Sequence, residues 1–378
     1  SDFHYMEMDF EIAPYYNQSY AINSEWLYVT DQWEEKENGG EGGTVYFGIT
    51  RKRFSDGFQE RNYALSTIQF LQWNKPFLLA DSAGNCYLFW QLSDSNGDVT
   101  YALEKYGTDG KMLWHTEHSL EDLAGMGERL DHGTVTDEGK VYLWSYGTGG
   151  SVFSFSLNGE LETVCTPKLE SLEGVVIGRE NRVYGYCITG EEPVFTELGN
   201  EENRYVCPMT PLTVYDGYEE GLCLSTGEAM FSYLPETGET KRLWGWNDGA
   251  VQINYSQVDR MFYDSGRYML LCFEMPLSGI YTRQILTAAD IRLQAGGNLP
   301  EKQTVMLATD YLADDTKRIV QMYNRQSEKY HIEIVVEENG DILQKKLLRG
   351  EGADLMEVGR IYTGDLARQG AFEDLEPY

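Results

Sequence analysis

The chain has 378 residues, with 61 acidic against 30 basic side chains and a formal net charge of −31. This charge repels phosphate groups, which argues against nucleic acid or an anionic membrane surface as a partner. The length exceeds one ordinary domain, and the many aromatic residues, 27 of them Tyr, favour strands over helices.

No run of about 18 apolar residues is present that would cross a membrane as a helix. The opening Ser1-Asp2-Phe3 has no basic or apolar region of a signal peptide, so an exported protein would have lost its signal.

The first predicted unit contains strands over Asn23–Thr30 and Thr44–Thr50, joined by the acidic, glycine-rich loop Glu34–Gly43. The second is the clearest, because two strand pairs are separated by turns with strong sequence signals. Its parts in order are the turn Asp81-Ser82-Ala83-Gly84, the strand Cys86–Leu92, the hairpin turn Asn96-Gly97, the strand Val99–Tyr106, the turn Thr108-Asp109-Gly110-Lys111 and a strand ending at Leu113-Trp114.

The same pattern of turn and strand recurs along the chain. The recurrences are Gly139–Leu143 with Asn158–Leu161, Asn181–Tyr184, Gly221–Leu224 with Thr237–Glu239, and Gly266–Leu270 with Tyr281–Leu286. The stretch Arg53–Phe70 is either a seventh unit or an insertion. A mainly β fold follows, in which residues 1–292 form a β-propeller of six to eight blades. A β-sandwich is the alternative, although it gives no reason for so regular a repeat.

After residue 292 the repeated pattern of turns and strands ends. Residues 293–302 have the composition of a linker, and residues 303–378 alternate between strand and helix. Strands are predicted at Gln303–Thr309, His331–Glu338 and Ala353–Val358. A first helix begins near Asp314-Asp315-Thr316, with an apolar stripe of Ile319, Met322 and Tyr323, and a second covers Ile342–Arg349. This β-α-β-α-β order favours a parallel sheet.

Several motifs of this last segment resemble an extracellular solute-binding protein of the ABC transporter type, a family that includes sugar-binding lipoproteins. They are Thr304-Val305-Met306-Leu307-Ala308-Thr309, Met322-Tyr323-Asn324-Arg325-Gln326, Arg349-Gly350-Glu351-Gly352-Ala353-Asp354-Leu355 and the closing Gly370–Tyr378. Ala353 stands where the family usually has proline. The match covers only the start of a periplasmic-binding-protein lobe, so the α/β segment is expected to be a truncated solute-binding domain.

The resemblance implies a bacterial uptake component that captures a solute, plausibly an oligosaccharide, for the membrane permease of an ABC transporter. It also implies an extracellular, cell-surface lipoprotein whose parent protein is attached to the membrane by a lipid anchor. The propeller would then bind a glycan or a protein. A solute is expected beyond the carboxyl ends of the parallel strands, where the candidate binding residues are Asp310, Tyr311, Asn339, Arg360 and Tyr362. The alternative is that these five are ordinary solvated loop residues with no role in binding.

No catalytic motif is found, and neither a metal nor a cofactor is expected. The nearest group of potential metal ligands is His115-Thr116-Glu117-His118 with Asp131-His132, which polar residues in an irregular segment also explain. The six cysteines lie far apart, four of them in apolar runs, which favours buried thiols over disulfides.

Two further functions remain open. One is a non-catalytic propeller scaffold for interactions between envelope proteins. The other is a propeller glycan hydrolase or lyase, since acids from different blades can meet around one central mouth. We expect no enzymatic activity, and rank the scaffold above the enzyme.

Overall fold

A computed structural model describes residues 2–8, 19–36, 43–63, 76–93, 99–119, 130, 132–190, 192–200, 202–247, 252–274, 285–292, 302–327, 329–337, 340–357, 368 and 370. By contacts, the chain divides into two compact units. The larger is Asp2–Gly245 with Tyr255–Leu293, and the smaller is mainly Gln294–Tyr378 together with Trp246–Asn254. No helix in the described part is both long and apolar enough to cross a membrane.

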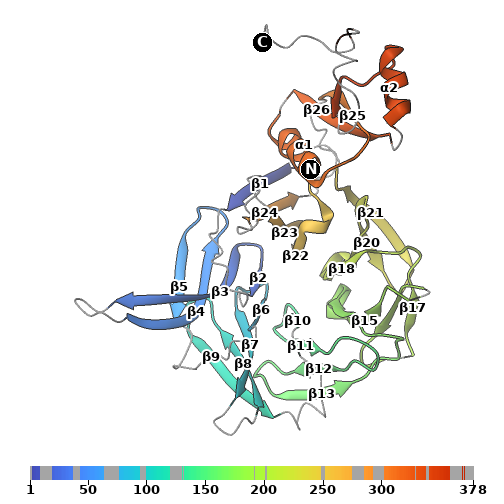
Figure 1. The fold of residues 1–378 in the computed structure, drawn as a ribbon. Coiled ribbons are helices and arrows are strands. Elements are labelled where there is room, and N and C mark those ends of the chain that lie inside the picture. Colours follow the sequence, from blue (N-terminus) through green and yellow to red (C-terminus); the bar gives the residue numbers. More distant parts are fainter. Residues whose placement is uncertain are drawn as a thin grey trace. The chain divides into compact units, whose positions relative to one another are not determined.

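The larger unit is a six-bladed β-propeller of four-stranded antiparallel sheets (Figure 1). Blades 1 and 2 contain β2 (Tyr20–Ile22), β3 (Trp26–Lys36), β4 (Gly43–Arg53), β5 (Gln59–Tyr63), β6 (Phe77–Ala80), β7 (Cys86–Ser93), β8 (Val99–Tyr106) and β9 (Met112–Ser119). Blades 3 and 4 contain β10 (His132–Val135), β11 (Val141–Trp144), β12 (Val152–Phe155), β13 (Leu161–Cys165), β14 (Gly174–Ile177), β15 (Val183–Cys187), β16 (Val194–Glu197) and β17 (Arg204–Val206).

Blade 5 contains β18 (Thr213–Tyr215), β19 (Leu222–Ser225), β20 (Ala229–Leu234) and β21 (Glu239–Gly245), and blade 6 contains β22 (Val258–Asp264), β23 (Arg267–Glu274), β24 (Ile285–Arg292) and β1 (Asp2–Met8). Single 3₁₀ turns occur at Arg179–Asn181, Tyr218–Glu220 and Tyr255–Gln257. The first strand of each blade contacts the first strand of a neighbouring blade, so these strands surround the propeller axis.

The last blade joins the two ends of the propeller sequence. Strand β1 pairs antiparallel with β24 along its whole length, from Asp2 opposite Arg292 to Met8 opposite Leu286. The sequence did not predict this strand. The stretch predicted as a seventh blade or an insertion instead supplies β5, the fourth strand of blade 1, and its residues 64–70 lie outside the described part.

The propeller core consists of apolar layers between neighbouring blades. Between blades 4 and 5, for example, the buried layer is Val176, Tyr184, Phe195, Cys207, Val214, Leu222, Leu224 and Tyr233. All six cysteines are free thiols in the structure, and five of them are buried, the exception being Cys165, which confirms the prediction that most of these side chains are buried.

The smaller unit contains a parallel sheet in the order β26 (Tyr330–Val336), β25 (Gln303–Thr309), β27 (Leu355–Glu357), with helices α1 (Asp314–Gln326) and α2 (Gly340–Leu348). The apolar stripe of α1 does not form its buried side. Ile319 is 53% exposed, whereas Val320 and Asn324 are buried.

Asn324 explains this orientation of α1. Its Nδ2 donates to the Ile332 carbonyl oxygen at 2.8 Å, and its Oδ1 accepts from the Ile332 backbone N–H at 2.6 Å. Ile332 lies in the edge strand β26, so one side-chain amide satisfies backbone groups that a further strand would otherwise pair.

Candidate functional site

Turns after the first strand of several blades bring acidic residues together at one end of the propeller axis. We call Asp81, Asp137, Asp216, Glu219 and Asp264 the axial acidic cluster. Asp81 belongs to blade 2, Asp137 to blade 3, Asp216 and Glu219 to blade 5, and Asp264 to blade 6. Their proximity is evident in the pKa of Asp137, which is raised by partial loss of hydration and then by the carboxylates of Asp264, Glu219 and Asp81.

Two members of the cluster hold the structure around them. The buried Asp81 carboxylate accepts from the Asn85 backbone N–H at 2.8 Å and from the Tyr87 hydroxyl at 2.9 Å, which fixes the turn of blade 2. Asp216 accepts from the Thr134 hydroxyl of blade 3 at 2.6 Å and from the Ile177 backbone N–H of blade 4 at 2.7 Å. Asp216 therefore joins three blades.

The pKa of Asp216 is raised to about 6, because burial disfavours the charged carboxylate more strongly than its hydrogen bonds from Thr134 and Ile177 favour it. The neighbouring Asp137 raises it further. At neutral pH the carboxylate is ionised, but it takes up a proton under only mildly acidic conditions.

Tyr218 forms the base of this site. Its hydroxyl donates to the Val135 carbonyl oxygen of blade 3 at 3.0 Å, and its ring lies 6.2 Å from that of Phe262 in blade 6. The backbone of Tyr218 has φ 45°, a left-handed conformation that is uncommon for a bulky residue. Gly217 makes the turn possible, because a Cβ there would lie 1.8 Å from the Gly221 carbonyl oxygen.

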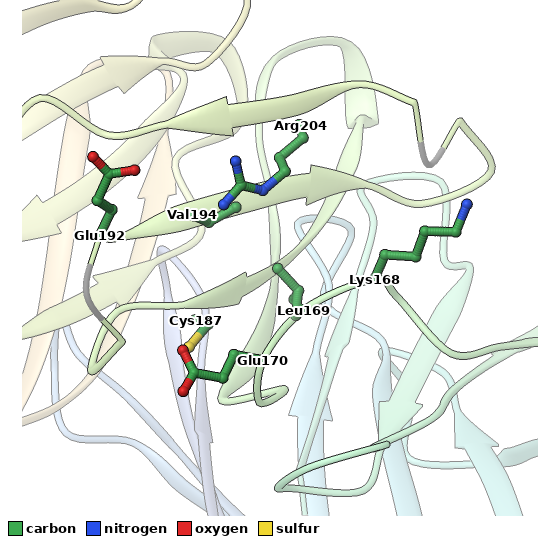
Figure 2. A pocket seen from close by; sticks show the side chains of 7 residues that line it. All are labelled: Lys168, Leu169, Glu170, Cys187, Glu192, Val194 and Arg204. Carbon is green, nitrogen blue, oxygen red and sulfur yellow. The ribbon is translucent and has the colours of Figure 1, made fainter.

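A second candidate is a pocket of about 270 Å³ in blade 4 (Figure 2). Its lining residues are Lys168, Leu169, Glu170, Cys187, Glu192, Val194 and Arg204. It is formed by the β13–β14 connection, by Glu192 of the β15–β16 connection and by residues of β15, β16 and β17. The pocket therefore lies at the Cys187 end of β15, which is the end far from the β14–β15 turn.

The sequence-predicted solute site is only partly described. Asp310 and Tyr311 directly follow β25, and the Tyr311 side chain is 74% exposed. The backbone N–H of Tyr311 donates to the Thr309 hydroxyl at 3.2 Å. Asn339, Arg360 and Tyr362 lie outside the described residues. The five residues therefore remain a prediction as a binding set.

His115 and His118 lie on strand β9 and His132 begins β10, so the histidine group is not in the irregular segment that was predicted. The Nδ1 atom of His115 is 2.7 Å from Glu104 Oε1, and its Nε2 is 3.1 Å from Glu117 Oε1. Burial lowers the pKa of His115, but the two carboxylates outweigh this effect and leave it raised. Asp131 lies outside the described part. Within that part, no three His, Cys, Asp or Glu side chains are arranged to hold a metal ion.

The axial acidic cluster was missed at the sequence level, although a signal for it exists. The turns Asp81-Ser82-Ala83-Gly84, Asp137-Glu138-Gly139 and Asp264-Ser265-Gly266 all begin with aspartate and end with glycine. Aligning the repeated units on these turns places the aspartates at one end of the propeller axis. The contribution of Asp216 needs the structure, because its turn has a different length.

No protein-family model matches the chain, and no curated protein matches it either. Solved structures similar to it include propeller proteins. A glucose dehydrogenase is 8% identical with a TM-score of 0.41, over 77% of this chain and 100% of the other. Regucalcin from Agrobacterium tumefaciens, described as calcium-binding, is 13% identical with a TM-score of 0.38, over 65% and 84%.

A GH43_1 enzyme from Xanthomonas citri is 12% identical with a TM-score of 0.31, over 75% of this chain and 88% of the other. These similarities are too low to carry a function from any of these proteins to this chain.

The resemblance to a solute-binding protein is wrong, because the matches are propeller proteins and no solute-binding lobe is indicated among them. The motifs that suggested it are a strand, the end of a helix, the glycines after the second helix and the closing Gly370–Tyr378. The first three occur in many β-α-β units, so they specify secondary structure rather than a family. The predicted permease partner, lipid anchor and extracellular location followed from that resemblance and have no other support.

Proposed function

We propose that the propeller is a non-catalytic scaffold that binds a basic segment of a partner protein at the axial acidic cluster. The observation that carries this proposal is the crowding of carboxylates from four blades around Asp137, whose pKa is raised first by partial loss of hydration and then by these neighbouring carboxylates. Carboxylates held close together disfavour each other's charged form, and a lysine or arginine side chain placed among them relieves that repulsion.

The charge of the whole chain supports the same partner. A net charge of −31 attracts a basic segment over a distance and speeds its association, an effect that weakens as salt screens it. The Tyr218 turn gives the cluster a base tied to blades 3 and 6, so a cation meets a preorganised surface.

The test is the binding of a short lysine-rich peptide to the full chain at low ionic strength, measured by isothermal titration calorimetry. We expect the double change Asp137→Asn/Glu219→Gln to weaken binding about tenfold, since two exposed carboxylates then no longer face the cation. The matched control is Glu228→Gln/Glu239→Gln, which neutralises two exposed acids of blade 5 outside the cluster and leaves the affinity unchanged. Equal losses in both variants would show that net charge alone attracts the peptide.

A glycan hydrolase is the second candidate, because a carboxyl group with a pKa near 6 suits a general acid. Against it, Asp216 already accepts a hydrogen bond on each of its oxygens. Incubating the chain with a panel of oligosaccharides separates the two functions. The scaffold predicts no turnover, whereas turnover that is lost in Asp216→Asn establishes the enzyme.

A further inference from the structure

The blade 4 pocket has an apolar floor. Cys187 and Val194 are buried and stand opposite each other on β15 and β16, and Leu169 adds a partly buried side chain from the β13–β14 connection. This connection packs closely on the sheet. A Cβ at Gly185 would lie 3.2 Å from Leu172 Cδ1 and 3.3 Å from Pro167 Cγ.

The chain that follows the lining residue Cys187 is also fixed. The Glu173 carboxylate accepts from the Ile188 backbone N–H at 2.8 Å and from the Thr189 hydroxyl, so the chain is held where it leaves β15. A pocket built in advance of its ligand avoids much of the ordering cost of binding.

Charges of both signs surround this floor. Among the described residues, the Arg204 side chain has no ion-pair or hydrogen-bond partner, although the chain is rich in acids and the side chains of Arg51 and Arg267 both have carboxylate partners. Glu170 and Glu192 likewise have none within the described part. In Figure 2 the Arg204 side chain extends toward Val194, while the Lys168 ammonium points away from the other labelled residues.

Thr196 adds a buried polar atom beside the pocket. It is 1% exposed, its hydroxyl has no hydrogen-bond partner among the described residues, and it lies opposite Arg204 in the β16–β17 register. Because side chains alternate along a strand, Thr196 shares the sheet face of Val194. A buried hydroxyl without a partner is unfavourable, and a ligand or water that reaches it would satisfy it.

We propose that this pocket binds a free aliphatic α-amino acid. Arg204 binds the carboxylate, Glu170 and Glu192 bind the ammonium group, and the aliphatic side chain lies on Val194 and Leu169. The volume of about 270 Å³ is just below the roughly 300–1,000 Å³ of pockets for drug-sized ligands, which suits a molecule as small as leucine. This site is separate from the axial acidic cluster, and the inference does not depend on the proposed scaffold function.

The experiment is calorimetric titration of the full chain with L-leucine and with two analogues of similar shape. These are 4-methylpentanoate, which lacks the ammonium group, and 3-methylbutylamine, which lacks the carboxylate. We expect leucine to bind and each analogue to bind at least about tenfold more weakly than leucine, because each analogue loses one charge-assisted interaction. No heat from leucine at millimolar concentrations, or equal binding of either analogue, overturns the proposal.

Variants locate the site. Arg204→Gln is expected to weaken leucine binding about tenfold or more. Its matched control is Lys241→Gln, which removes an exposed cation from β21, the corresponding outer strand of blade 5, and leaves binding unchanged. Leucine binding that survives Arg204→Gln places the ligand elsewhere and contradicts the assignment. A circular dichroism spectrum unchanged from wild type confirms that the Arg204 variant is folded.

Discussion

In the propeller most apolar side chains of the inner strands are buried between neighbouring sheets, whereas in the α/β unit Ile319 and Tyr323 of the apolar stripe of α1 are exposed. Phe195 in blade 4 is fully buried, and Ile319 in α1 is 53% exposed. A repeated sheet always has a similar sheet to cover its faces. The three-stranded sheet has no such repeat, and α1 is tied to it by polar contacts: Asn324 is hydrogen-bonded to the edge strand β26, and Thr316 donates to Glu357 of β27.

The largest difference in stability effect between the propeller and the α/β unit is expected when one apolar side chain in each is truncated to alanine. Phe195→Ala should lower the free energy of unfolding by about 3–5 kcal/mol, because it leaves a cavity between blades 4 and 5. Ile319→Ala should change it by no more than about 0.5 kcal/mol, as for an ordinary surface position. Guanidinium denaturation of both variants measures this difference, and comparable losses would show that Ile319 is covered in solution.

The next effect concerns the polar contact that orients α1. Asn324→Ala removes both hydrogen bonds to Ile332 and should destabilise the α/β unit by about 2–3 kcal/mol. Hydrogen exchange at the amides of β25 and β26 measures this change without interference from the propeller. If protection is lost equally across β19 and β20, the two units unfold together and the comparison between them fails.

A smaller effect, confined to the propeller, depends on pH. The pKa of Asp216 is raised to about 6 when folded, so the folded state holds its proton more tightly than the unfolded state, in which the pKa is about 3.9. Stability attributable to this group therefore falls as the pH rises from about 4 to about 6. Because Asp216 is not fully buried, we expect a fall of about 1–2 kcal/mol, less than the full shift implies.

Asp216→Asn removes this titration. The difference in unfolding free energy between wild type and variant, measured by urea denaturation from pH 4 to pH 7, should follow the fall described above. A difference that stays constant over this range would show that the pKa of Asp216 is not raised.

The smallest effect is expected at the base of the cluster. Tyr218→Phe removes the hydroxyl that donates to the Val135 carbonyl oxygen and should cost about 1 kcal/mol. The ring and its contact with Phe262 are kept, so peptide binding should change little. Thermal unfolding of this variant beside Tyr87→Phe, which loses a hydrogen bond within a single blade, shows whether a contact between blades has a larger effect.

The propeller was predictable because its signals are local and repeated. The turn Asp81–Gly84 and the strands after it occur again in later blades, and the structure has six blades, within the predicted range. The pairing of β1 with β24 could not be predicted in the same way, because it joins residues nearly 300 positions apart and no turn connects them.

The site was less predictable for a similar reason. Each aspartate of the axial acidic cluster looks like an ordinary turn residue in its own blade, and only the closure of the ring brings Asp137 near Asp264. The orientation of α1 was likewise hidden. Its apolar stripe predicted the buried side by the usual rule, but the structure buries Val320 and Asn324 instead, and Asn324 is hydrogen-bonded to Ile332.

The most direct test of the scaffold proposal is the number of protons exchanged when the lysine-rich peptide binds near pH 6. Calorimetry in two buffers of different ionisation enthalpy gives this number. A cation beside Asp137 and Asp216 lowers the pKa of both carboxyl groups, so wild type should release protons on binding, and Asp137→Asn/Asp216→Asn should release markedly fewer. Binding without proton release, or with the same release in the double variant, would contradict the placement of the partner at the axial acidic cluster.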